Sequence, residues 1–223
     1  MVSVIIAAAG SGSRMNSSVK KQFMTLLEVP ILVRTLRKFD LTCIDEIIIV
    51  TNSDDVGEVQ ALLKVYGISK VTQVIAGGNT RQASIYNGLK AVGGDYVLVH
   101  DAARPFVTRD IIEAHVASLS NIGLITAVPC KDTIKVVADG FVKETLDRSV
   151  LMNVQTPQSF ETESLLKAYD HAALEGLSVT DDASVYEAFG LKVKVVLGSY
   201  DNIKITTPED LVQGEIILKR GKK

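Results

Sequence analysis

The sequence predicts an α/β protein built on a doubly wound, mostly parallel sheet. Short runs rich in β-branched residues alternate with helical patterns along most of the 223 residues, and each run is almost entirely apolar. Strands buried on both faces of a parallel sheet have this character, and strand–helix–strand alternation with right-handed crossovers builds such a sheet. A small-residue loop with two glycines follows the first run, as expected at the carboxyl edge of a Rossmann-like sheet.

The elements follow in order along the chain. Strands are expected at five apolar runs, residues 2–9, 46–51, 71–76, 95–100 and 123–129. Helices are expected between them at 31–39, 53–67, 80–92 and 108–119. The last third returns to the same alternation, with helices at 162–175 and 181–189, a strand at 192–198 and a helix at 208–220. We therefore expect one domain over residues 1–223.

One segment, 132–147, departs from this alternation of strands and helices. Apolar and polar residues alternate on either side of Asp139-Gly140, which is the strongest short-range signal for a β-hairpin. Such a hairpin is either a flap over the site or an arm that reaches a second subunit. Because a two-stranded ribbon is only marginally stable alone in water, we favour a protruding arm at about 131–150 that joins two chains in a homodimer.

Composition excludes several classes of protein. Hydrophobic residues make up 47% and charged residues 22% of the chain, and the net charge is −2, so no basic excess is present for nucleic-acid binding. Cys43 and Cys130 fit no metal-binding spacing, and His100, His115 and His171 do not cluster. We expect free thiols in a reducing cytoplasm, no signal peptide and no membrane span.

The first loop, AAAGSGSRM, suits the approach of an anion. Gly10 and Gly12 allow ligand oxygens to come close to backbone N–H groups. A third glycine is absent, as is the Gly-Lys-Ser/Thr of a P-loop, so neither a dinucleotide fingerprint nor a Walker site is predicted. Arg14 and Lys21 follow the loop closely. They are either a solvated surface pair or a clamp on a triphosphate, whose reacting phosphate gathers charge on its oxygens.

Two further polar clusters lie at expected strand ends. In VHDAARPF, Asp101 ends a strand and Arg104 follows it; the carboxylate could meet a ribose hydroxyl or a metal ion, or could merely cap a loop. In AGGNTRQASIYNGL, a glycine pair precedes a helix that carries Arg81 and Ser84 near its start. A helix N-terminus with these side chains suits an anion or the polar edge of a base.

Taken in order, AAAGSGSRM, KKQF, GGNTRQASIYNGL, VHDAARPF, KDTIK, TPQSF, TDDAS and NIKITTPEDL resemble the blocks of the 2-C-methyl-D-erythritol 4-phosphate cytidylyltransferases, enzymes of the non-mevalonate isoprenoid pathway. The resemblance runs from about residue 4 to 211. It implies a nucleotidyltransferase fold that uses CTP and Mg²⁺, with the hairpin swapped across a homodimer. Two departures stand out: Lys20 occupies a position where many relatives have proline, which makes it a competing cation beside Lys21, and only one arginine, Arg14, is present in SGSR.

The resemblance also implies residue roles. The catalytic set would be Arg14, Lys21, Arg148 and Lys204, with the first two stabilising the pentacovalent α-phosphate. The nucleotide-binding set would be Ala7, Ala8, Ala9, Gly10, Gly78, Asn79, Arg81, Ser84 and Asp101, with Asp101 also on the Mg²⁺ side. The acceptor-binding set would be Arg104, Thr133, Arg148, Thr156, Thr180 and Lys204, with Thr133 and Arg148 serving the neighbouring subunit.

The expected reaction is an in-line displacement in which a phosphate oxygen of the sugar-alcohol phosphate attacks the α-phosphorus of CTP. Because that phosphate has a second pKa of about 6, no general base is needed. Three alternatives remain open: a ribitol 5-phosphate cytidylyltransferase, a sugar-phosphate nucleotidyltransferase specific for another base, and a non-catalytic nucleotide-binding module on the same fold.

Overall fold

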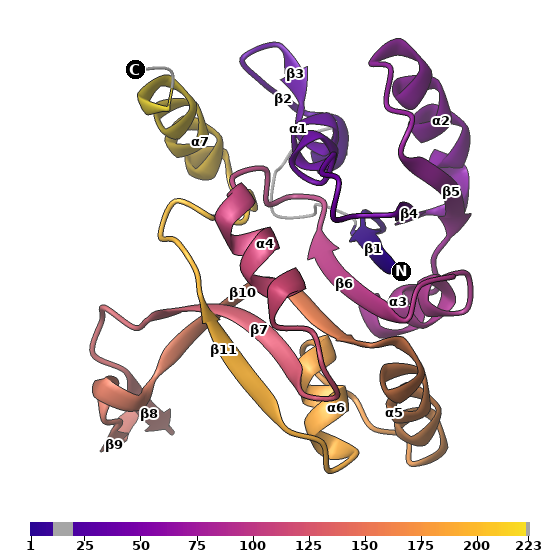
Figure 1. Ribbon diagram of the computed structural model, residues 1–223. Helices are drawn as coiled ribbons and strands as arrows, with labels where there is room; N and C mark the ends of the chain where they lie inside the picture. The colour runs from indigo at the N-terminus through magenta and orange to yellow at the C-terminus, as the bar shows by residue number, and fades with distance from the viewer. Residues whose placement is uncertain (11–19, 222–223) are drawn as a thin grey trace.

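The computed structural model describes residues 1–10 and 20–221, and its centre is a seven-stranded sheet (Figure 1). The strand order is β11-β7-β10-β6-β1-β4-β5. The strands are β1 (Val2–Ala7), β4 (Glu46–Thr51), β5 (Val71–Ala76), β6 (Tyr96–Asp101), β7 (Gly123–Pro129), β10 (Met152–Glu161) and β11 (Val193–Leu197). All neighbours run parallel except β10, which is antiparallel to both β6 and β7. The expected doubly wound, mostly parallel sheet is confirmed.

Helices cover both faces of this sheet. They are α1 (Ile31–Lys38), α2 (Val56–Val65), α3 (Arg81–Leu89), α4 (Arg109–Ala117), α5 (Thr162–Leu174), α6 (Asp182–Ala188) and α7 (Pro208–Arg220). Alternate residues of β1 face opposite ways: Val4 and Ile6 pack with α1, α2 and α4, whereas Ile5 packs with α3, α5 and α6. β1 and β4 are mostly apolar because both of their faces lie against helix layers.

The boundaries of most elements agree with the sequence patterns. Thr80 and Thr108 accept hydrogen bonds from the N–H groups of Ala83 and Ile111, and so cap α3 and α4. Several boundaries shift: β1 ends at Ala7 rather than at residue 9, α3 ends at Leu89 rather than at residue 92, and the first turn of the segment expected at 53–67 is a 3-10 helix, η3 (Ser53–Asp55). None of the helices in the described part of the chain is long and apolar enough to cross a bilayer.

The hairpin lies where Asp139-Gly140 predicts it. Strands β8 (Lys135–Ala138) and β9 (Phe141–Thr145) pair with each other and with no other strand of the described residues, and they project away from the main sheet (Figure 1). Asp139 and Gly140 have φ of 54° and 80°, the left-handed conformations that a two-residue type I′ turn requires. A smaller hairpin, β2 (Thr25–Leu26) and β3 (Val29–Pro30), was not expected from the sequence.

The long strand β10 is the main element that the sequence patterns do not predict. Its sequence, MNVQTPQSFE, is largely polar and carries a proline, whereas the other central strands are apolar. The pairing with β7 shifts register between Gln155 and Gln158, next to the cis bond between Thr156 and Pro157. Polar side chains are accepted in this central strand because buried partners satisfy them: Ser159 Oγ lies 2.7 Å from Nδ1 of His115 on α4.

Burial of His115 makes stability depend on pH. Burial lowers the pKa of His115 to about 4, whereas an unfolded histidine titrates near 6.5. Unfolding therefore takes up a proton between these values, so the free energy of unfolding falls as the pH is lowered from 7 to 4. Because of His115, we expect the free energy of unfolding to be roughly 1–2 kcal/mol lower at pH 5 than at pH 7. Urea denaturation of the wild type and of His115→Asn at both pH values measures this contribution, and an equal pH dependence in the two proteins would contradict it.

Candidate active site

A cavity of about 470 Å³ opens at the carboxyl ends of β1, β4 and β6, the edge where doubly wound sheets hold ligands. Residues that the sequence singled out line much of it: Ala7, Ala8, Ala9, Gly10, Lys21, Gly78, Asn79, Arg81, Ser84, Asp101 and Lys204. Five further lining residues were not anticipated: Gln22, Asn52, Thr80, Ala102 and Ala103. Because segments far apart in sequence meet at this edge, the fold assembles the cavity from six separate segments.

The loop before α3 is closed by its own hydrogen bonds. The N–H of Gly78 donates to Ser84 Oγ over 3.1 Å, and the Ser84 hydroxyl donates to the carbonyl of Thr80 over 2.8 Å. A Cβ built on Gly78 would lie 2.5 Å from Cβ of Ala83, so only glycine fits this tight approach. Ser84 lines the cavity, and its hydroxyl holds the loop in place through its hydrogen bonds with Gly78 and Thr80.

Asp101 is the one carboxylate among the described residues that line the cavity. Three cations surround it: Lys204 Nζ at 2.9 Å and Arg104 Nε at 3.5 Å from Oδ2, and Arg81 Nε at 3.9 Å from Oδ1. Burial opposes ionisation, but these cations together hold the pKa of Asp101 well below its ordinary value. The carboxylate is therefore ionised throughout the physiological pH range.

Arg81 is fixed from behind by a buried carboxylate. Asp182, fully buried at the start of α6, accepts from Arg81 Nη1 at 3.2 Å and from Nη2 at 2.6 Å. The hydroxyl of Tyr169 on α5 donates to the same carboxylate over 2.5 Å. Burial lowers the pKa of Arg81, but the charge of Asp182 outweighs it and the pKa is raised. This bidentate pair ties α3 to α5 and α6 and sets the direction in which the guanidinium faces Asp101.

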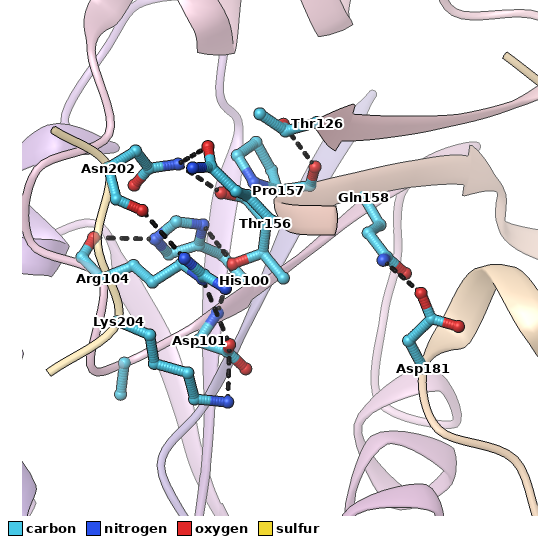
Figure 2. A network of polar contacts seen from close by, with 12 residues as sticks. His100, Asp101, Arg104, Thr126, Thr156, Pro157, Gln158, Asp181, Asn202 and Lys204 are labelled. Carbon is cyan, nitrogen blue, oxygen red and sulfur yellow. Dashed lines mark hydrogen bonds and ion pairs between the residues drawn. The ribbon is translucent and has the colours of Figure 1, made fainter. Parts of the chain in front are cut away.

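Arg104 and Thr156 lie behind Asp101 in a chain of hydrogen bonds (Figure 2). His100 Nε2 is 3.0 Å from the carbonyl of Arg104, which can only accept, so Nε2 carries the proton. His100 Nδ1 then accepts from the Thr156 hydroxyl over 3.1 Å, and Thr156 Oγ1 accepts the N–H of Asp101 over 3.1 Å. Arg104 Nη1 also donates to the carbonyl of Asn202 over 2.8 Å. These bonds hold the end of β6 against β10.

The structure separates the two adjacent lysines. Lys21 lines the cavity, whereas Lys20 forms an ion pair with Asp55, a buried residue of η3 that is 3% exposed. Asp55 has no counterpart among the motifs found in the sequence. Lys20 is therefore paired with a carboxylate that lies 35 residues further along the chain.

Not all expected site residues meet in this cavity. Thr133 and Arg148 line a different hollow of about 520 Å³ at the base of the hairpin, where Arg148 Nη1 donates to the carbonyl of Lys131 over 2.8 Å. Thr180 is exposed and is not among the described lining residues. Arg14 lies outside the described residues, as does most of the loop between Gly10 and Lys21.

The residues around Asp101 can be compared with the ligands that the expected Mg²⁺ requires. Across the described residues, no three His, Cys, Asp or Glu side chains gather in a way that could hold a metal ion. Mg²⁺ commonly binds through one or two carboxylates together with substrate phosphates and water. A single ionised carboxylate in a cavity lined by Lys21, Arg81 and Lys204 fits that mode, in which the nucleotide supplies the remaining ligands.

Comparison with known proteins gives a consistent result. The family model for 2-C-methyl-D-erythritol 4-phosphate cytidylyltransferase matches residues 2–220. A curated protein of that name from Clostridium novyi is 48% identical, covering 98% of this chain and 96% of its own. One from Alkaliphilus oremlandii is 47% identical, covering 97% and 94%.

Solved structures agree with the sequence comparisons. The 4-diphosphocytidyl-2C-methyl-D-erythritol synthase of Anaerococcus prevotii superposes with a TM-score of 0.86 at 35% identity, covering 98% of this chain and 96% of its own. The 2-C-methyl-D-erythritol 4-phosphate cytidylyltransferase of Francisella tularensis superposes with a TM-score of 0.80, also at 35% identity, covering 97% and 99%.

Proposed function

The chain belongs to the 2-C-methyl-D-erythritol 4-phosphate cytidylyltransferase family of the non-mevalonate isoprenoid pathway, and we propose that the cavity around Asp101 is where it transfers CMP. CTP and 2-C-methyl-D-erythritol 4-phosphate would give 4-diphosphocytidyl-2-C-methyl-D-erythritol and pyrophosphate. One observation carries this assignment of the site: at the carboxyl edge of the sheet, Lys21 and a glycine-rich backbone line the same cavity as one ionised carboxylate, Asp101, to which Arg81 and Lys204 are paired.

The nucleotide half of the site consists mainly of backbone. Residues Ala7 to Gly10 and the loop at Gly78 and Asn79 line the cavity with small side chains, so that cytosine and ribose can approach main-chain N–H and C=O groups. Arg81 and Asp101 would face the ribose and triphosphate. Mg²⁺, when bound through Asp101 and the phosphates, would neutralise charge on the leaving pyrophosphate.

The chemistry requires positioning and charge stabilisation. A phosphate oxygen of the acceptor forms a bond to the α-phosphorus, and the bond from that phosphorus to the bridging oxygen of pyrophosphate breaks. The acceptor phosphate is ionised near pH 7 because its second pKa is about 6, so the chain need supply no general base. Lys21, with Arg14, would donate to the α-phosphate oxygens as charge builds in the transition state.

The acceptor would be held by two sets of residues. Lys204 lines the cavity, and Arg104 and Thr156 lie immediately behind Asp101. Thr133 and Arg148 lie at the base of the hairpin and would reach the site of a partner chain. Thr180 would complete the set. We place the reaction in the cytoplasm, where Cys43 and Cys130, both free thiols, would stay reduced.

The exposed apolar surface of the hairpin supports the homodimer. Phe141, Val142 and Val137 are 74%, 59% and 57% exposed, which is unfavourable for an isolated ribbon in water. We expect the wild type to be a dimer by light scattering, and Phe141→Glu with Val142→Lys to shift it to a monomer with impaired pyrophosphate release. Leu174→Glu, at an 85% exposed position on α5, is the matched control. A monomeric wild type with full activity would contradict the proposal that the hairpin joins two chains in a homodimer.

Pyrophosphate release tests the proposed function directly. CTP and Mg²⁺ are supplied with 2-C-methyl-D-erythritol 4-phosphate or, in parallel, with ribitol 5-phosphate. We expect release with the first acceptor only. Release with ribitol 5-phosphate alone would keep the chemistry and reassign the acceptor, whereas binding of CTP with no release from either acceptor would contradict the proposed mechanism.

A further inference from the structure

Asp55 is a buried carboxylate beside the cavity, and the proposed mechanism does not use it. It ends η3, just after the carboxyl end of β4, and it is 3% exposed. A carboxylate in such a place is costly unless charged and polar partners satisfy it. Three donors do so in this structure: Lys20 Nζ, Gln22 Nε2 at 3.3 Å and Asn52 Nδ2 at 3.1 Å.

Two of these donors flank Lys21. Lys20 and Gln22 precede and follow it at the start of the 3-10 turn η2 (Lys21–Phe23), and both contact the same carboxylate. Gln22 is itself 2% exposed. Lys20 is extended, with φ of −64° and ψ of 139°, and the turn begins at Lys21. Because the side chains on both sides of Lys21 are anchored to Asp55, the backbone of Lys21 is held from both sides at the place where this residue lines the cavity.

The charges lead to the same conclusion. The ion pair with Asp55 holds the charge of Lys20 outside the cavity lining, whereas Lys21 is the lysine of this pair that lines the cavity. We propose that Asp55 is a positioning residue for cytidylyl transfer: it holds Lys20 and Gln22 against the end of β4 and thereby aims Lys21 at the α-phosphate of the nucleotide. This inference rests on the proposed role of Lys21.

Asp55→Asn tests the proposal with little change in shape. An amide offers one acceptor oxygen where three donors converge, and its NH₂ group would face another donor. Small displacements of a group that acts in the transition state are costly, so we expect kcat to fall roughly tenfold. Asp54→Asn, at the exposed neighbouring position of the same turn, is the matched control and should keep kcat within about twofold.

A double-mutant cycle separates positioning from simple destabilisation. If Asp55 acts through Lys21, Asp55→Asn combined with Lys21→Met should have the kcat of Lys21→Met alone. Losses that multiply in the double variant would overturn the proposal, as would a normal kcat in Asp55→Asn beside an impaired Lys21→Met. If Asp55→Asn does not fold, Lys20→Met replaces it in the cycle; it removes the charged partner and should give a several-fold, equally non-multiplying loss.

The same double-mutant cycle distinguishes the positioning role of Asp55 from the proposed function on which that role rests. A Lys21→Met enzyme with normal kcat would overturn the proposed role of Lys21, and the positioning role of Asp55 with it. An impaired Lys21→Met with independent effects at residue 55 would leave the proposed function intact and overturn only the role of Asp55.

Discussion

Lys21→Met is expected to lower kcat by roughly 10²–10³, the loss measured when one preorganised oxyanion donor is removed. The apolar stem is kept and only the charge that lines the cavity is lost. Because the charge on the α-phosphate oxygens is greatest in the transition state, the effect should appear in kcat more than in the KM for CTP. Steady-state pyrophosphate release at saturating acceptor measures both, and Arg14→Ala should give a loss of similar size.

Lys20→Met is the matched comparison. The same charge is removed one residue away, from a side chain paired with Asp55 outside the cavity. Its loss should be several-fold, through positioning alone, and much smaller than that of Lys21→Met. Equal losses in the two variants would mean that the structure does not distinguish the two lysines in function.

Asp182→Asn is expected to produce the largest loss of stability. The change leaves the guanidinium of Arg81 without its bidentate partner and the hydroxyl of Tyr169 without its charged acceptor. Breaking a buried pair by removing one partner costs about 3–5 kcal/mol. Because the Arg81 side chain is 33% exposed, water offsets part of this cost, and we expect about 3 kcal/mol. In a chain of this size, that loss lowers Tm by roughly 6–12 °C.

Urea denaturation and thermal melts measure this loss, with Glu187→Gln as the control. Glu187 is exposed on the same helix, α6, so its neutralisation should change the free energy of unfolding by less than about 0.5 kcal/mol. If Asp182→Asn were as stable as the wild type, loss of the Arg81–Asp182 ion pair would not lower the free energy of unfolding, and the prediction would be wrong. Activity of the folded fraction should also fall, because Arg81 would no longer be held toward Asp101.

The sequence predicted turns and strands correctly where they depend on residues that are close together in the chain. The hairpin turn follows from Asp139-Gly140, since few residues other than glycine, asparagine and aspartate adopt positive φ readily. The strands β4, β5 and β7 coincide with their apolar runs at 46–51, 71–76 and 123–129. β10 was missed for the opposite reason: its polar residues find partners only after α4 and β7 have packed beside it.

By itself, the sequence determined most of the alternation of strands and helices, the glycine loops at the carboxyl edge and the family to which the chain belongs. The tertiary structure alone decided which carboxylate holds which cation. Asp55 takes Lys20 across 35 residues, and Asp182 takes Arg81 across 101. The physical reason is range: backbone preference and hydrophobic periodicity act over a few neighbours, whereas an ion pair depends on which distant segments the fold brings within contact. Lys20 and Lys21 have identical side chains, and only the family resemblance separates them in the sequence; the fold shows the physical difference, a buried Asp55 that pairs with Lys20.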